Sequence, residues 1–168
     1  DEAESNVKIL DEFKDSNLLD ELNILHSQGI DHIEPSDLSG ALKGRKNLYN
    51  HMESLINNAS KSVVIMSTEK GILRKSNILL NAIKKAKKKG VSVRIATSVS
   101  KKAANKLKEL SKYAKIKHTN KLQGRFLIAD DKDMTFAILE GEEVHPTYDV
   151  GIWISTPFFA KTMSSMFE

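Results

Sequence analysis

From residue 42 onwards, hydrophobic and polar positions switch between the period of a helix and the period of a strand. Apolar side chains that recur every three or four positions predict amphipathic helices, and short alternating or continuous apolar runs predict strands. The predicted helices cover residues 46–59, 76–89, 101–113 and 157–167. The predicted strands cover residues 62–67, 91–97, a brief stretch at Ile116, 125–129, 134–139 and 148–155. This order predicts an α/β fold, with a mixed sheet covered by helices on both faces.

The first part of the chain has a weaker pattern. Residues 4–28 show two short apolar faces of helical period, and Gly29 and Pro35 then indicate a loop. Residues 1–43 carry 11 Asp/Glu and 3 Lys/Arg, a net charge of −8. We therefore expect residues 1–41 to be an acidic helical segment for dimerisation or linkage, followed by a domain at 42–168. Because the chain begins at Asp1 without methionine, we also expect an amino-terminal portion to be missing.

The composition and the absence of common motifs exclude several kinds of site. The 168 residues include no cysteine, which excludes disulfides and thiolate zinc sites. No apolar run approaches the roughly 18 residues of a membrane span, so we expect a cytoplasmic protein without membrane contact. The sequence has no phosphate-binding or dinucleotide-binding glycine motif and no paired histidines of zinc-site spacing, and we expect no cofactor and no metal. Asp130, Asp131 and Asp133 are explained by a hairpin turn between the strands at 125–129 and 134–139.

Positive charge is concentrated in one block. Residues 75–121 carry 15 Lys/Arg and 1 Asp/Glu, a net charge of +14. Such a block is compatible with direct binding of nucleic acid. The alternative is that these lysines occupy the solvated faces of two helices, and the run at 84–89 lies near a helix end, where cations are favourable.

Residues 123–130, with the sequence QGRFLIAD, have the outline of a catalytic strand. A histidine at the first position and a lysine at the third would complete the His-x-Lys-x4-Asp motif of the phospholipase D superfamily. Here the positions hold Gln123 and Arg125, and only Asp130 fits. Since an amide cannot serve as the nucleophile of a covalent phosphoryl intermediate, we expect no catalytic residue and no enzyme activity.

Three further sequence segments occur in the order and spacing typical of one protein family. They are LKGRKNL at 42–48, INNASKSVVI at 56–65 and KGVSVRI at 89–95. Together with the altered motif strand, they resemble the effector domain of TrmB-type archaeal transcription regulators over residues 42–168. The resemblance implies a phospholipase D-like fold, preceded by a short helical segment.

The resemblance also implies a function. In that family a winged helix-turn-helix binds DNA, a helical segment dimerises, and the phospholipase D-like domain senses a small molecule. We therefore expect a non-catalytic sensor and dimerisation domain that forms a homodimer, with DNA bound through a winged helix that this chain does not contain. A phosphodiesterase or nuclease with an altered site, and direct nucleic-acid binding through residues 75–121, stay open as alternatives.

A ligand site, if the motif strand retains one, is expected where the parallel strands end. Arg125 can bind a phosphate or a carboxylate through two hydrogen bonds, and Gln123 can donate and accept. The effector would then be a small or anionic molecule. The strand ends add hydroxyl and carboxylate side chains to the candidate site: Ser67, Thr68 and Glu69, and Thr97 and Ser98. The other interpretation is an ordinary strand, in which Gln123 and Arg125 face solvent or a second subunit.

Overall fold

The computed structural model describes Ile24 and residues 34–120, 124–140 and 143–167. The chain divides into two units, Asp1–Glu34 and Pro35–Glu168, and the sheet lies entirely in the second. The helical pattern predicted at 4–28 lies almost wholly outside the described residues.

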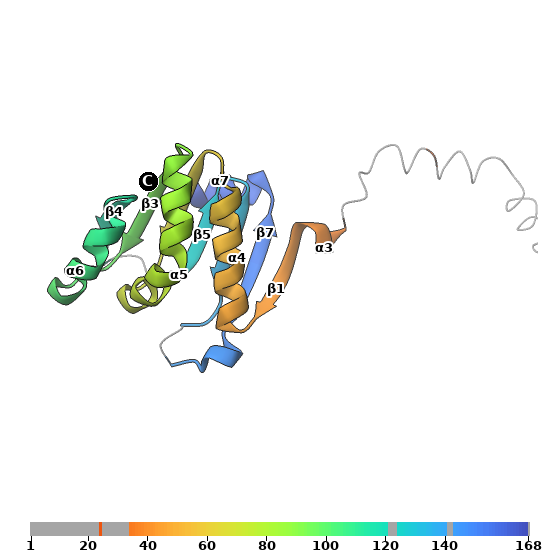
Figure 1. Ribbon diagram of the computed structural model, residues 1–168. Helices are drawn as coiled ribbons and strands as arrows, with labels where there is room; N and C mark the ends of the chain where they lie inside the picture. Colours follow the sequence, from red (N-terminus) through yellow and green to blue (C-terminus); the bar gives the residue numbers. More distant parts are fainter. Residues whose placement is uncertain (1–23, 25–33, 121–123, 141–142, 168) are drawn as a thin grey trace, which may run out of the picture. The chain divides into compact units, whose positions relative to one another are not determined.

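A seven-stranded mixed sheet forms the centre of the second unit, in the order β1-β7-β6-β5-β2-β3-β4 (Figure 1). β2, β3 and β4 pair in parallel, and the other neighbours pair antiparallel. The strands are β1 (Ser39–Lys43), β2 (Ser62–Met66), β3 (Ser92–Thr97), β4 (Lys115–His118), β5 (Phe126–Ala129), β6 (Asp133–Ala137) and β7 (Val150–Ser155).

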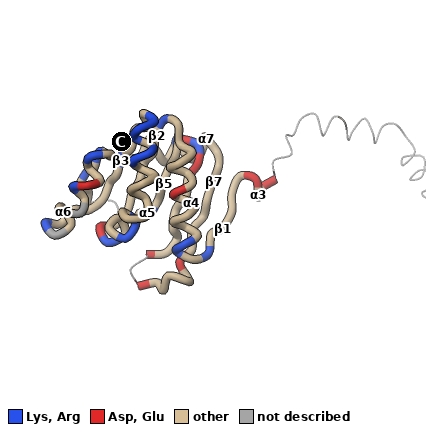
Figure 2. The backbone as a smooth tube through the Cα atoms, in the orientation of Figure 1, with Lys and Arg blue, Asp and Glu red and all other residues tan. Residues whose placement is uncertain are grey.

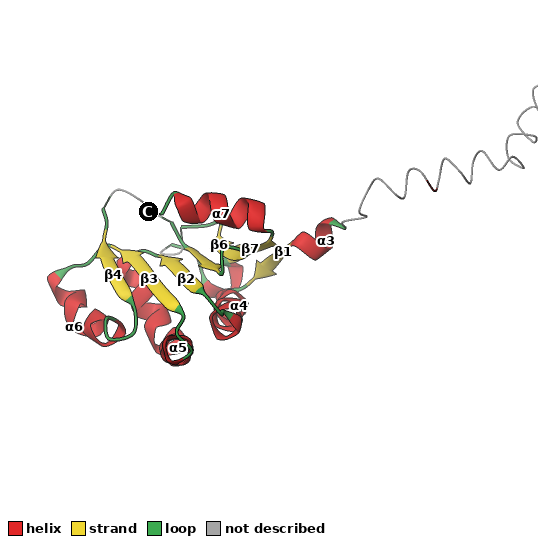
Figure 3. Cartoon of the chain, turned by 90° about the horizontal axis from the view of Figure 1, so that it is seen from above, coloured by secondary structure: helices red, strands yellow, loops and turns green. Residues whose placement is uncertain are grey.

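Helices cover the two faces unequally, as Figure 3 shows. Three of them cover one face: α4 (Arg45–Asn58), α5 (Glu69–Lys88) and α6 (Lys101–Leu110). A single helix, α7 (Pro157–Ser165), lies on the other face. The short helices α3 (Pro35–Leu38) and η1 (Pro146–Tyr148) precede β1 and β7.

Two apolar clusters hold these layers together. The larger one lies between the sheet and the three helices, and it includes Leu48, Ile65, Ile83 and Ile95, each fully buried. The smaller one lies under α7 around Ala160. Burial of apolar surface at this density is the main source of stability in such a fold.

The order of the helices and strands predicted from residue 46 onwards is confirmed, and the largest differences are an earlier start of α5 and an additional strand, β1. α5 begins at Glu69, seven residues before the predicted start, because Thr68 caps it: the Thr68 hydroxyl accepts a hydrogen bond from the Gly71 amide at 3.1 Å. The strand β1 was not predicted. Gly40 in β1 lies against Trp153, and a β-carbon there would come within 2.5 Å of the indole nitrogen.

The topology brings distant segments to one edge of the sheet. The parallel strands β2 and β3 end at this edge with Met66 and Thr97. Because β5 is antiparallel to β2, residue Arg125 at its start lies at the same edge, and Asp130 after its end lies at the opposite one. Asp149, just before β7, also belongs to the first edge, where its carbonyl accepts from the Gly44 amide at 2.7 Å.

Candidate functional site

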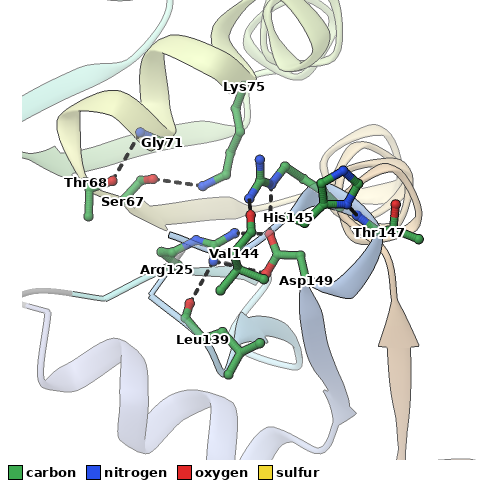
Figure 4. Close-up of polar contacts among 11 residues, drawn as sticks. Ser67, Thr68, Gly71, Lys75, Arg125, Leu139, Val144, His145, Thr147 and Asp149 are labelled. Carbon is green, nitrogen blue, oxygen red and sulfur yellow. Dashed lines mark hydrogen bonds and ion pairs between the residues drawn. The ribbon is translucent and has the colours of Figure 1, made fainter. Parts of the chain in front are cut away.

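Arg125 is buried at the edge where the parallel strands end, with 6% of its surface exposed. Its guanidinium donates two hydrogen bonds to the Asp149 carboxylate, Nη1 to Oδ1 at 3.1 Å and Nη2 to Oδ2 at 2.7 Å. Nη1 also donates to the Leu139 carbonyl at 2.7 Å (Figure 4). Arg125 therefore does not face solvent, and two of its three nitrogens are bound within the domain.

Asp149 also binds a second arginine. The Nε of Arg45, at the start of α4, donates to Asp149 Oδ2 at 2.9 Å, and its Nη2 donates to the Val144 carbonyl at 3.0 Å. Burial alone would raise the pKa of the Asp149 carboxyl, but the hydrogen bonds and charges of Arg125 and Arg45 outweigh it and hold this pKa below its ordinary value. One fully buried carboxylate thus compensates two arginines.

The Lys75 side chain, from α5, lies at the same edge of the sheet, where the parallel strands end, and is fully buried. Its ammonium donates to the Ser67 hydroxyl at 2.8 Å, as Figure 4 shows, and lies 5.8 Å from the centre of the Tyr49 ring. Burial lowers the pKa of Lys75 from 10.5 to about 7, with further lowering by Arg125 and Arg74, and Asp149 opposes the shift. Lys75 therefore changes charge near neutral pH.

Two buried donors in this cluster have no hydrogen-bond partner among the described residues: the Tyr49 hydroxyl and the Arg125 Nε. A buried donor without an acceptor costs roughly 1–3 kcal/mol. Such groups, together with a buried lysine of strongly lowered pKa, are typical of functional sites.

The residues predicted from the strand ends take different roles. Ser67 and Thr97 are buried, and Ser67 is the hydrogen-bond partner of Lys75. Thr68 caps α5, and the Thr97 hydroxyl donates to the Ser98 carbonyl at 3.3 Å. Gln123 lies outside the described residues.

Glu69 and Ser98 lie in an open pocket of about 470 Å³ beside the strand ends. The Glu69 carboxylate accepts hydrogen bonds from the Ser100 amide and, at 2.9 Å, from its hydroxyl. The residues around the pocket are Glu69, Lys70, Ser98, Val99, Ser100, His118 and Asn120. The structure thus brings two of the predicted residues to a common surface and leaves Ser67 and Arg125 in the buried cluster.

Sequence reasoning missed Lys75, Tyr49, Arg45 and Asp149. One signal was available for Lys75, which lies three residues after the buried Ile72 and four before the buried Leu79. A lysine within the apolar stripe of a helix indicates a buried charge. The signal was lost because the helix was predicted to begin only at residue 76.

Asp130, the acidic end of the motif strand, is distant from this cluster. Its carboxylate accepts hydrogen bonds from the backbone amides of Ser60, Lys61 and Ser62 at 2.7–2.9 Å, and from the Ser60 hydroxyl at 3.0 Å. Burial raises the pKa of Asp130, but these hydrogen bonds outweigh it and lower the pKa below its ordinary value. Asp130 and Asp131 have φ angles of 55° and 53°, which confirms the predicted hairpin turn.

The basic block extends over α5, α6 and β4, and Figure 2 shows its densest part at the end of α5. Besides the buried Lys75, two of its lysines have internal partners. Lys84 binds Glu109 at 3.3 Å and lies over the Tyr113 ring, and Lys89 donates to the Asn57 carbonyl. The side chains of Lys85, Lys87 and Lys88 are exposed.

Metal and membrane features are absent from the part of the chain that the structure describes. Within it, no three His, Asp or Glu side chains gather as metal ligands. No helix in the same part has the length and apolar character needed to cross a membrane.

Solved structures similar to this chain share its fold. The archaeal chromatin protein TrmBL2, described as having a novel mode of DNA binding, aligns with a TM-score of 0.60 and 16% identity over 99% of this chain. The chain spans 63% of the length of that protein. NucT from Helicobacter pylori aligns with a TM-score of 0.61 and 18% identity, over 76% of this chain and 91% of NucT.

The phospholipase D family member Nuc from Salmonella typhimurium aligns with a TM-score of 0.55 and 14% identity, again over 76% of this chain and 91% of the other. These likenesses show a phospholipase D-like fold. A search with the sequence finds no match among curated proteins. The family described as transcriptional regulator TrmB, EBD N-terminal subdomain, matches residues 41–167. The chain therefore belongs to the TrmB family of transcriptional regulators, and these residues are the amino-terminal subdomain of its effector-binding domain.

Proposed function

We propose that this domain is a non-catalytic sensor of a TrmB-type regulator, and that the chain acts in the cytoplasm as a homodimer. The observation that supports this most strongly is the state of Arg125. At the position where the phospholipase motif has lysine, the guanidinium is buried and bound by Asp149 and the Leu139 carbonyl. It acts there as part of an internal ion pair, and its Nη atoms are not available to hold a phosphodiester.

The nucleophile position supports the same proposal. Residue 123 is glutamine, whose amide neither titrates near neutral pH nor forms a phosphoryl intermediate. Among the described histidines, the Nδ1 of His51 pairs with the Thr135 hydroxyl, and the Nδ1 atoms of His118 and His145 accept from backbone amides. Neither the motif strand nor these histidines supply the pair of free imidazoles that phospholipase D chemistry uses.

A hydrolysis assay tests the absence of catalysis. We expect the natural chain to hydrolyse bis(4-nitrophenyl) phosphate no faster than buffer. Turnover that falls in both Gln123→Ala and Arg125→Ala would contradict the proposal. Arg125→Lys is the control for folding, because it keeps a cation for Asp149.

Dimerisation is the second part of the proposal. The acidic residues 1–34 precede the sheet unit, and we propose that they join two copies of the chain, with DNA bound by a winged helix of the full regulator. Sedimentation equilibrium of this chain should give the mass of a dimer. A monomer at high protein concentration would contradict this part while leaving the sensor assignment in place.

Direct contact with DNA is a second candidate function. Lys85, Lys87 and Lys88 are exposed together at the end of α5 (Figure 2). If they contact phosphates, DNA binding by this chain should weaken with rising salt, and replacing Lys84 and these three lysines by glutamine should abolish it. No binding at low salt would dismiss this candidate.

A further inference from the structure

The buried cluster at the sheet edge contains hydrogen-bond donors that its described acceptors do not match. The Asp149 carboxylate pairs with both Arg125 and Arg45. Lys75 adds an ammonium group with three N–H donors, and the Ser67 hydroxyl is its one hydrogen-bond acceptor among the described residues.

The unpartnered groups of the cluster are all donors that an anion would satisfy. Tyr49 is 5% exposed, Arg125 is 6% exposed and Lys75 is fully buried. The Tyr49 hydroxyl and the Arg125 Nε have no partner in the described structure. These groups belong to one cluster, since the Tyr49 ring contacts the Lys75 ammonium and the charge of Arg125 acts on Lys75. A carboxylate or a tetrahedral oxyanion presents only acceptors and would match them.

We propose that Lys75, Tyr49 and Arg125 form the receptor for the acidic group of a small effector, which carries a carboxylate or a phosphate-like oxyanion. This inference rests on the proposed sensor function and names the class of its ligand. Lys75 and Tyr49 come from α5 and α4, so the receptor uses helix residues outside the motif strand. The open pocket lined by Glu69 and Ser98 lies beside the ends of the same parallel strands.

The charges around Lys75 predict that proton uptake accompanies binding. Arg125 before β5 and Arg74 on α5 disfavour the ammonium form, Asp149 before β7 favours it, and the Tyr49 ring from α4 lies beside it. A bound anion would raise the pKa of Lys75 from about 7. The anion should therefore bind more tightly below pH 7, where the lysine is charged, than above it.

Calorimetric titration with sodium sulfate and, separately, with sodium acetate tests the receptor. Both probes keep their charge between pH 6 and 8, so a pH dependence reports the protein. We expect one or both anions to bind the natural chain, with an affinity about tenfold higher at pH 6 than at pH 8. The anion that binds identifies whether the effector group resembles phosphate or a carboxylate.

Two variants remove single donors without creating a buried unpaired charge. Lys75→Met should weaken anion binding about 10- to 100-fold and abolish the pH dependence, and Tyr49→Phe should weaken it about 3- to 10-fold. Tyr49→Phe removes a hydroxyl that has no partner among the described residues, and Lys75→Met replaces a buried cation by an apolar side chain of similar length at the cost of the Ser67 hydrogen bond. Because both variants keep a similar shape in the core, we expect both to fold. Lys161→Met, at an exposed position on α7, is the matched control and should bind as the natural chain does.

Absence of binding by both anions would overturn the inference, and so would unchanged binding in Lys75→Met or an equal loss in Lys161→Met. These outcomes are separate from those of the hydrolysis assay. Phosphodiester turnover would contradict the non-catalytic function, whereas missing anion binding would remove only this ligand class.

Discussion

The charged residues at the two ends of the motif strand, Asp130 and Arg125, differ in how completely hydrogen bonds compensate their charges. At one end, the Asp130 carboxylate accepts from three consecutive backbone amides and a hydroxyl, and its hydrogen bonds are complete. At the other end, Arg125 shares the Asp149 carboxylate with Arg45, and its Nε has no hydrogen-bond partner among the described residues. It lies near Lys75, whose pKa is lowered to about 7.

This difference leads us to assign a structural role to the Asp130 end and to propose a functional role for the Arg125 end. The Asp130 end ties the turn after β5 to the start of β2 and stabilises the fold. The Arg125 end contains buried polar groups that cost stability, and such groups are concentrated at functional sites. On our proposal, the motif strand therefore has a scaffold end at Asp130 and a recognition end at Arg125.

The largest effect should come from removing the shared carboxylate of the recognition end. Asp149→Asn would remove the carboxylate charge that pairs with the buried Arg125 and the part-buried Arg45, and we expect the free energy of unfolding to fall by about 3–5 kcal/mol. Urea denaturation at pH 7 measures this loss. The exposed Asp37→Asn should change it by less than about 0.5 kcal/mol. A loss below about 1 kcal/mol in Asp149→Asn would mean that the arginines do not depend on this carboxylate.

Lys75→Met should have the opposite sign. The pKa of Lys75 is about 7 in the folded chain and 10.5 as its ordinary value, so the unfolded chain binds an extra proton between these two pH values. The cost of burying Lys75 is therefore fully present below pH 7 and is relieved as the pH rises towards 10. After allowing for the lost Ser67 hydrogen bond, we expect Lys75→Met to gain roughly 3 kcal/mol at pH 6.

Urea denaturation at pH 6 and pH 9 checks this prediction, and the gain should be clearly smaller at pH 9. If Lys75→Met is less stable than the natural chain at pH 6, the lysine belongs to the scaffold and the contrast between the two ends of the strand is lost.

Substitution of Asp130 should act on the scaffold alone. Asp130→Ala leaves three backbone amides without their acceptor and should cost about 2 kcal/mol, whereas Asp130→Asn keeps one oxygen and tolerates the positive φ angle, and should cost about 1 kcal/mol. Since hydrogen bonds lower the pKa of Asp130, its contribution is present above its ordinary pKa and is lost as the pH falls through the lowered folded value. Thermal unfolding from pH 2 to 6 measures both effects. A change in sulfate binding in either variant would contradict the separation of the two ends.

Most of the helices and strands could be predicted from the sequence, because the spacing of hydrophobic and polar positions distinguishes one from the other. The helix of residues 46–59 and the strand of residues 62–67 have clear periods and hydrophobic runs, and both lie within one residue of their predicted ends. β1 was missed because it is an edge strand with one glycine and mixed polarity. The start of α5 was missed because Gly71 interrupts the helical pattern, and a glycine is required there: a β-carbon would come within 2.5 Å of the Ser67 hydroxyl.

The candidate site was only partly predictable. The motif strand indicated Arg125, and the ends of the parallel strands indicated Ser67. Asp149 could not be found in this way, because it meets Arg125 and Arg45 only through the pairing of β6 with β7 and of β1 with β7. Charge pairs between residues that are distant in the chain depend on strand register, and a single sequence does not reveal them.

Nuclear magnetic resonance of chains with isotope-labelled lysine tests the central claim most directly, because it follows the Lys75 ammonium itself. The claim predicts a Lys75 pKa of about 7 in the free protein, which rises by one unit or more when the anion that binds is added. An unchanged Lys75 pKa at saturating sulfate and acetate would contradict the assignment of this cluster as an anion receptor.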